Sequence, residues 1–222
     1  MKKLKLTVAL VLIAFSLTTK AQNIIIKAGL SSTDLKMSDN SGAIDQFNNA
    51  KKSIHFGVFM DRKVNDLISF ETGLVFDQKG TKQIMTFGGN TITNLLSVKT
   101  LNLPVALKIG MDASEDIRIF GKLGGYGGYN LSGEVASKVV DASGTTTSDT
   151  TSTLQIGSDV AAGDQLKKMD FGATIGAGIQ YKRLSLEINY DMGLANLATD
   201  QSVGQNFKNK EFKVSLGYHF GK

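Results

Sequence analysis

The chain of 222 residues contains no cysteine and a single proline. Without cysteine there is neither a disulfide framework nor a thiolate metal site. Proline interrupts strands, so its near absence beside 24 glycines suits long, closely packed strands and argues against a flexible Pro-rich linker. No long apolar run follows the first 21 residues, which excludes a helical membrane protein.

Residues 1–21 have the pattern of a cleaved signal peptide. A basic segment with three lysines precedes an apolar core at residues 6–15 and a cleavage site at Thr19-Lys20-Ala21. The alternative is a retained anchor helix, but the apolar core is too short to span a bilayer. The leader holds four lysines, so a net charge of +5 becomes about +1 in the remaining chain. The high isoelectric point therefore belongs mainly to the leader, and we expect no nucleic-acid partner.

Residues 168–194 show the clearest structural pattern in the chain. Apolar side chains alternate with polar or small ones for about ten residues on each side of Lys182-Arg183. A period of two predicts strands, and the very short connection predicts a β-hairpin. Ten residues are also the length that a tilted strand needs to cross a bilayer.

The same alternation recurs along the chain and predicts eight strands in total. Polar, turn-rich segments separate them, and these segments are long after the first, third, fifth and seventh strands and short elsewhere. The other predicted strands lie at 23–31, 52–62, 68–77, 95–110, 117–126 and 211–221, and the predicted long loops lie at about 32–50, 79–94, 132–167 and 195–209. Pro104 falls inside a strand, where we predict a bulge or a local distortion.

Alternation alone does not say which face of a barrel points inward. A soluble barrel such as a lipocalin has an apolar interior, whereas a membrane barrel has an apolar exterior. The apolar face here is bulky and would overfill an eight-stranded barrel, whereas the opposite face is rich in glycine and charge. A charged side chain facing lipid would cost about 2–4 kcal/mol near the midplane. The alternation of long and short connections also matches a membrane barrel with short periplasmic turns.

We therefore predict an all-β protein, an eight-stranded antiparallel up-and-down transmembrane β-barrel spanning residues 22–222. Its apolar face points outward around a polar, glycine-rich lumen. Within this lumen we expect a structural network of polar side chains: Lys27, His55, Glu71, Lys108, Arg118, Lys122, Asp170, Glu187, Asp191, Lys213 and His219.

Several short motifs resemble the PorT-type outer-membrane β-barrel domain family, and the similarity covers essentially the whole chain after the leader. They are Lys-Ala-Gln at 20–22, Ile-Lys-Ala-Gly-Leu at 26–30, Phe-Glu-Thr-Gly-Leu at 70–74, Leu-Asn-Leu-Pro-Val at 101–105 and Leu-Gly-Tyr-His-Phe at 216–220. The resemblance implies an eight-stranded barrel in a bacterial outer membrane and carries over no active site.

We predict no catalytic, cofactor-binding or metal-binding residues. His55 and His219 share the predicted lumen face with Ser185 and Ser215, but a Ser-His-acid relay requires hydrogen bonds that spacing does not establish. The two histidines lie on the second and eighth strands, which are not neighbours in the ring, so they do not predict a metal site.

The preferred function is that of a non-enzymatic outer-membrane barrel in a structural, interaction or envelope-accessory role. Outer-membrane lipid is the expected partner, together with an envelope protein bound through the external loops. The main alternative is a soluble periplasmic, lipocalin-like ligand-binding barrel. A narrow pore and a lipid-modifying barrel enzyme are further alternatives, although an eight-stranded interior is only wide enough for side chains.

Overall fold

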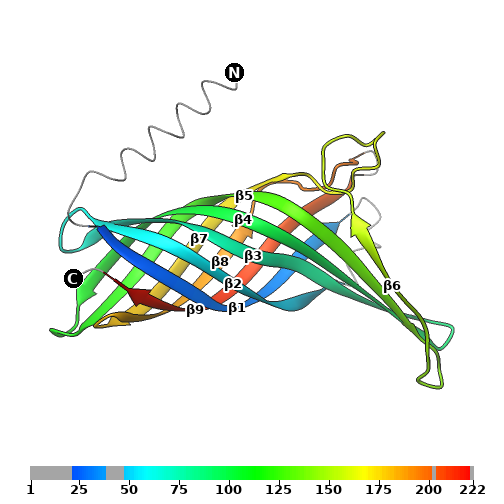
Figure 1. Ribbon diagram of the computed structural model, residues 1–222, viewed down its shortest axis with the longest axis horizontal. Coiled ribbons are helices and arrows are strands. Elements are labelled where there is room, and N and C mark those ends of the chain that lie inside the picture. Colours follow the sequence, from blue (N-terminus) through cyan, green and yellow to red (C-terminus); the bar gives the residue numbers. More distant parts are fainter. Residues whose placement is uncertain (1–21, 39–47, 202–203, 221–222) are drawn as a thin grey trace.

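A computed structural model describes residues 22–38, 48–201 and 204–220, which form nine antiparallel strands (Figure 1). Consecutive strands pair with each other, except that β7 pairs with β5 instead of β6, and β9 returns to pair with β1. Eight strands thereby close into a ring, as predicted, and β6 lies outside it, paired with β5. The bounds are β1 Gln22–Ser38, β2 Asn48–Lys63, β3 Ile68–Phe87, β4 Asn90–Asp112, β5 Ile117–Val140, β6 Thr146–Leu154, β7 Met169–Tyr181, β8 Leu184–Gly193 and β9 Asn206–His219.

The predicted signal peptide, residues 1–21, lies outside the described part of the chain. Within that part, no helix is long and apolar enough to cross a membrane.

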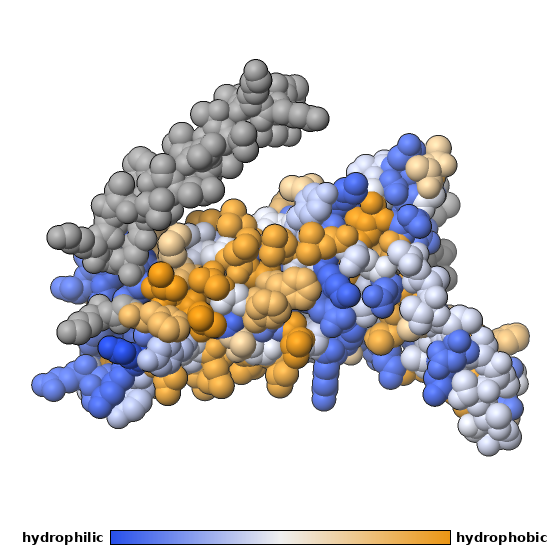
Figure 2. Space-filling model, in the orientation of Figure 1, coloured by the Kyte–Doolittle hydropathy of each residue, from blue (hydrophilic) through white to orange (hydrophobic). Residues whose placement is uncertain are grey.

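Apolar side chains on the barrel strands point outward and charged ones point inward, as predicted. Ile175 and Leu186 are 58% and 46% exposed, whereas Glu187, between Leu186 and Ile188 in sequence, is 1% exposed. Figure 2 shows one face of the resulting hydrophobic surface, which covers the middle of the barrel with hydrophilic side chains toward both ends; we call the exposed apolar residues of the barrel strands, such as Ile175, Leu186 and Ile188, the apolar belt. This orientation overturns the alternative of a lipocalin-like soluble barrel, which requires an apolar interior.

The two ends of the barrel differ as expected for a membrane barrel. Short turns at residues 64–67, 113–116 and 182–183 join β2 to β3, β4 to β5 and β7 to β8 at one end (Figure 1, left). The longer connections lie at the other end. In outer-membrane barrels the short turns face the periplasm and the long connections face the outside.

Two of the predicted long loops are wrong in kind, because β-structure fills much of them. Residues 79–94 belong to one continuous hairpin, in which β3 and β4 pair as far as a turn at Gly88-Gly89. Residues 132–167 contain the end of β5 and all of β6. The loop predicted at 32–50 is shorter than expected, because β1 extends to Ser38. Residues 39–47 of this loop lie outside the described part of the chain.

Continuous pairing beyond the belt produces an external sheet, formed by residues 81–87, 90–99, 132–140 and 146–154 of β3, β4, β5 and β6. β5 has 24 residues and β4 has 23, about twice the 9–11 residues that cross a bilayer. Threonine favours strands, so the Thr-rich sequence here extends the ladder even without apolar alternation. In Figure 1 this sheet projects well past the ring at the lower right.

Pro104 distorts the β3–β4 ladder without a bulge. Thr72 pairs with Val105 and Val75 pairs with Asn102, so the register is the same on both sides of the proline. Residues 73–74 of β3 and 103–104 of β4, which lie between these pairs, are not paired. The Thr72 hydroxyl donates a hydrogen bond to the Pro104 carbonyl oxygen at 2.9 Å. The register shift of β4 lies elsewhere, in its ladder with β5, where Thr100 pairs with Asn130 and Lys99 with Ser132 and Leu131 of β5 is left unpaired. The predicted distortion is confirmed, and a bulge at the proline is not found.

Glycines on the inner face let neighbouring strands and side chains approach closely. A Cβ at Gly124 would overlap the Val105 carbonyl oxygen and the Ala106 Cα of β4, whereas one at Gly127, on the outer face, would meet nothing within 4 Å. We expect Gly124→Val to destabilise the barrel by about 1–3 kcal/mol, the cost of overpacking. Gly127→Val is the matched control and should leave stability nearly unchanged. Urea unfolding in lipid vesicles, followed by circular dichroism, measures both, and equal effects would contradict the prediction.

Candidate functional site

All eleven polar residues predicted for the lumen lie on the inner face of the barrel strands. Ten have side chains that are nearly or fully buried. The eleventh, Arg118, lies at the periplasmic mouth with a side chain 18% exposed, and it forms an ion pair with Asp112 at 2.8 Å.

The first ion cluster fills the periplasmic half of the lumen and consists of three lysines and three carboxylates: Lys27, Lys108, Lys122, Asp61, Glu71 and Glu187. Glu71 forms ion pairs with all three lysines, at 2.7 Å to Lys27, 3.3 Å to Lys108 and 3.0 Å to Lys122. Glu187 lies 2.6 Å from Lys27 and 2.8 Å from Lys122. Formal charges therefore cancel within the cluster, which makes its burial tolerable.

Strand register creates the space for these long side chains. Lys27 lies directly opposite a glycine on each neighbouring strand, Gly57 of β2 and Gly217 of β9. Glu187 similarly faces Gly178. Lys108 and Lys122 face each other across β4 and β5, a repulsive arrangement that Glu71 relieves by pairing with both.

Aromatic rings complete the lumen packing. The ammonium groups of Lys27 and Lys108 lie 4.4 and 4.2 Å from the ring centroids of Phe59 and Phe120. A cation over an aromatic face is stabilised by the ring quadrupole, so these rings replace part of the hydration that the lysines lose on burial.

The second ion cluster fills the lumen toward the outside: Asp77, Lys79, Asp170, Asp191, Glu211 and Lys213. Lys213 contacts three carboxylates, at 2.8 Å to Asp77, 2.9 Å to Asp191 and 3.1 Å to Glu211. Lys79 pairs with Asp170 at 3.0 Å. Asn209 donates a further hydrogen bond to Asp170 at 2.8 Å.

Four members of these clusters were absent from the predicted network: Asp61, Asp77, Lys79 and Glu211. All four have odd residue numbers, as do the other inward-facing residues of β2, β3 and β9. The predicted strand ends at residue 77 and so does not include Lys79, whereas the burial alternates as far as Lys79. The inward parity of β3, extended past Asp77, is the signal that would have found it.

Each of the two histidines lies within hydrogen-bonding distance of a serine hydroxyl. His55 Nδ1 lies 2.8 Å from the Ser31 hydroxyl oxygen, and His55 Nε2 lies 2.7 Å from that of Ser215. His219 Nε2 lies 3.1 Å from the Ser185 hydroxyl oxygen. With serines on both ring nitrogens, His55 has no carboxylate to orient it, which the relay requires. Among the described residues, no group of three or more potential ligands could hold a metal ion.

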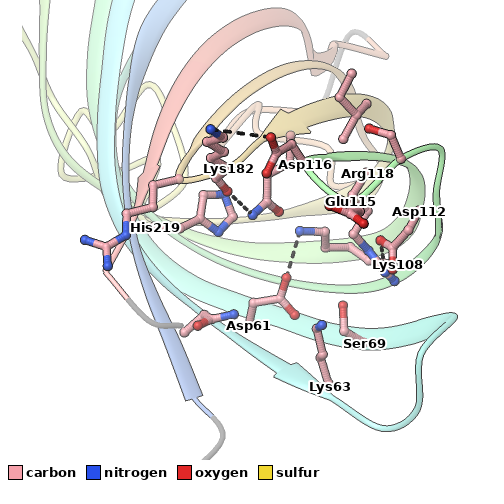
Figure 3. Close-up of a pocket in the computed structure, with 15 residues that line it drawn as sticks. Asp61, Lys63, Ser69, Lys108, Asp112, Glu115, Asp116, Arg118, Lys182 and His219 are labelled. Atoms are coloured by element: carbon pink, nitrogen blue, oxygen red, sulfur yellow. Dashed lines mark hydrogen bonds and ion pairs between the residues drawn. The ribbon is translucent and has the colours of Figure 1, made fainter.

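A bowl-shaped cavity of about 360 Å³ opens at the periplasmic mouth (Figure 3). Asp61 and Lys108 point toward each other at its base, 2.8 Å apart, and Lys182 approaches Asp116 at 3.4 Å on its rim. Most of its charged groups are therefore paired. Deeper in the lumen, between the clusters, a cavity of about 50 Å³ has room for only a few water molecules.

An apolar plug closes the outer end of the lumen and consists of Leu35, Leu96, Val98, Leu154, Leu166, Ala195 and Leu197. The segment after β6 folds back over this end, where the Lys167 backbone N–H donates to the Leu197 carbonyl at 2.9 Å. The Leu197 N–H in turn donates to the Phe207 carbonyl at 2.8 Å. Side chains therefore occupy most of the lumen between its two ends, with charges inside the belt and apolar groups beyond it.

A closed ring of eight tilted antiparallel strands with an apolar exterior and an ion-paired interior defines a transmembrane β-barrel of the bacterial outer-membrane class. The chain belongs to the outer membrane protein beta-barrel domain family, whose sequence profile matches residues 19–199. The match covers the ring as far as β8.

Solved structures with a similar arrangement include three small outer-membrane proteins. OprG of Pseudomonas aeruginosa is 14% identical, with a TM-score of 0.44 over 91% of this chain and 98% of that one. Neisserial surface protein A is 11% identical, with a TM-score of 0.43 over 88% and 96%. Ail, the attachment invasion locus protein of Yersinia pestis, is 13% identical, with a TM-score of 0.40 over 90% and 99%. Comparison with curated proteins finds no match.

Proposed function

We propose that this protein is a non-enzymatic outer-membrane barrel that presents its external sheet to a protein partner at the cell envelope. The observation that carries the proposal is the contrast between a lumen filled by ion pairs and apolar side chains and strands that continue far past the belt. A filled lumen does not suit conduction. A pore or a lipid-modifying enzyme would not need the extra strand length, whereas a docking surface does.

The outermost strand of the external sheet is suited to recognition by strand addition. β6 pairs only with β5 among the described strands, so its other edge presents unpaired backbone donors and acceptors. Residues 146–153 of β6 are all exposed and are all Thr, Ser or Asp. An extended peptide can add to such an edge by main-chain hydrogen bonds. Asp149 in its centre disfavours uncontrolled pairing between copies.

The hairpin that carries β6 ends in an ordered turn. The Asp141 carboxylate accepts hydrogen bonds from the Ser143 hydroxyl at 2.6 Å and from the backbone N–H of Ser143 and Thr145, both at 2.9 Å. The Ser143 hydroxyl bond, followed by that from Thr145, lowers the pKa of Asp141. Asp141 therefore stays ionised and holds the turn in one conformation. Because this turn leads into β6, the strand edge is ordered before a partner binds, which reduces the entropy lost on binding.

The remaining partners follow from the same architecture. The apolar belt takes outer-membrane lipid, and a net charge of about +1 after removal of the predicted leader gives no reason to expect a nucleic-acid partner. Within the wider family we assign the chain to the PorT-type group, on the motifs at 70–74 and 101–105.

The experiment compares two shortened variants after crosslinking and pull-down from outer membranes. In the first, residues 137–150 are replaced by Asn-Gly, which joins the cross-strand pair Ala136 and Thr151 and leaves the plug residue Leu154 in place. The matched control replaces residues 84–93 by Asn-Gly, which joins the pair Gln83 and Asn94 in the neighbouring hairpin.

We expect the first variant to lose the co-purifying partner and the control to keep it. Both should remain folded, which their heat-modifiable gel mobility reports. Retention of the same partners by the first variant would reject β6 as the contact. The absence of any crosslinked partner in the wild-type protein would reject the interaction role altogether.

A further inference from the structure

Beside the apolar plug lies a cavity of about 210 Å³ that the proposed function does not use. Its walls come from five ring strands and from the segments that fold back over the outer end of the barrel. The main apolar side chains that line it are Leu35, Leu96, Val135, Leu154, Leu166 and Phe207. Four of them are less than 10% exposed, so the walls belong to the packed interior of the external half.

Three of the four polar side chains at the cavity have hydrogen-bond partners outside its lining, and the fourth, Gln83, donates to the Met37 sulfur within it at 3.7 Å. Thr81 donates to Asp34 at 2.9 Å, and the Asn94 side-chain oxygen accepts from Ser137 at 2.8 Å. The Gln165 side-chain oxygen accepts from the Gln155 N–H at 3.4 Å. A buried water needs two to four polar partners, so this cavity favours an apolar occupant over ordered water.

We propose that the cavity is a binding site for a small apolar molecule, of the size of one six-membered ring with one or two additional carbons. The volume sets the size, because an apolar cavity of about 150 Å³ lined by aliphatic and aromatic side chains is known to hold benzene. Larger hydrophobic molecules exceed the available space, since sites for drug-sized ligands occupy about 300–1,000 Å³.

The ligand stays at the outer end of the barrel and does not pass through it. Directly below the plug lies the second ion cluster, where Lys79 and Asp170 are almost fully buried and 3.0 Å apart. An apolar molecule gains nothing by entering a lumen filled with charge. The site is therefore a pocket at the outer end of the barrel, and its proposal does not rest on a protein partner for β6, although Leu154 of β6 lines it.

The test is a titration of the full barrel with benzene in nanodiscs of a saturated phosphatidylcholine, followed by NMR of labelled Leu, Val and Ile methyl groups. Methyls of Leu35, Val135 and Leu166 should shift and saturate. Lipid-facing methyls of Ile175 and Leu186 report benzene dissolved in the bilayer and should drift linearly. Cavity methyls that merely follow the lipid-facing ones would overturn the proposal.

A filling variant and a matched control locate the binding. Val135→Phe places a ring in the cavity and should weaken benzene binding at least tenfold, whereas Leu131→Phe, on the exposed outer face of the same strand, should leave it unchanged. Unchanged binding by folded Val135→Phe would also overturn the proposal.

Should Val135→Phe not fold, Leu166→Ala provides the second measurement. It enlarges the cavity, so naphthalene should bind at least tenfold more tightly than to the wild-type protein. Equal naphthalene binding by both proteins would reject the site.

Discussion

Glu71→Gln is expected to lower the free energy of unfolding by about 3–5 kcal/mol, the range for removal of one partner from a buried ion pair. Glu71 is 3% exposed and is the only carboxylate among those described that pairs with all three lysines of the first ion cluster. The neutral amide leaves three buried ammonium groups with two carboxylates. Unfolding in urea from lipid vesicles, followed by circular dichroism and by heat-modifiable mobility, measures the loss.

Two further variants distinguish the effect of unbalanced charge in the cluster from a nonspecific loss of stability. Glu71→Gln combined with Lys27→Met restores equal numbers of positive and negative groups, so the double variant should regain a substantial part of the loss. Glu134→Gln is the exposed control, because its pair with Lys99 spans 3.8 Å and both side chains are about half exposed. Exposed pairs contribute about 0–1 kcal/mol. Strictly additive losses in the double variant would show that charge balance does not hold the cluster together.

Ile175→Lys is expected to cost about 2–4 kcal/mol, the penalty for a lysine on the lipid-facing surface near the bilayer midplane. Ile175 lies at the centre of β7 and is 58% exposed, so the substitution removes no buried packing. In water the same change would be close to neutral. The penalty therefore arises from lipid, and it tests directly that lipid surrounds the belt.

Leu184→Lys provides the matched control for depth. Leu184 is 59% exposed, almost the same as Ile175, but it begins β8 beside the periplasmic turn. Near the interface the cost falls to about 0–1 kcal/mol, because the ammonium group reaches water. Equal costs at the two positions, measured by unfolding from vesicles, would contradict the assignment of the membrane plane.

The sequence was sufficient to predict the ring and its orientation, because the apolar alternation on each barrel strand reports lipid on one side. Glu187 between Leu186 and Ile188 is the simplest case, and burial follows the predicted parity. The alternation of inward and outward positions also predicts most of the charged residues in the lumen. It does not predict which of them form ion pairs, since Lys27, Glu71 and Glu187 lie on three different strands and come together only when the ring closes.

Prediction was poorest outside the membrane. Beyond the belt, water contacts the outer surface of the strands, so residues 146–153 of β6 are all exposed Thr, Ser or Asp and the apolar alternation disappears. The sequence of residues 79–94 and of much of 132–167 consequently predicts loops. The apolar plug was missed for a related reason: Leu35, Leu154 and Leu197 lie in polar, turn-rich segments, and only the folded chain gathers them.

The position of Lys27 bears on how the protein enters the membrane. Its two carboxylate partners are on β3 and β8, so both ion pairs form only once the beginning and the end of the chain have met. An open, partly inserted sheet without β8 would lack Glu187 and would leave the three lysines of the first ion cluster with fewer carboxylates than the closed ring supplies. Insertion one strand at a time is therefore penalised, and the ring is expected to assemble and enter the bilayer in one concerted event.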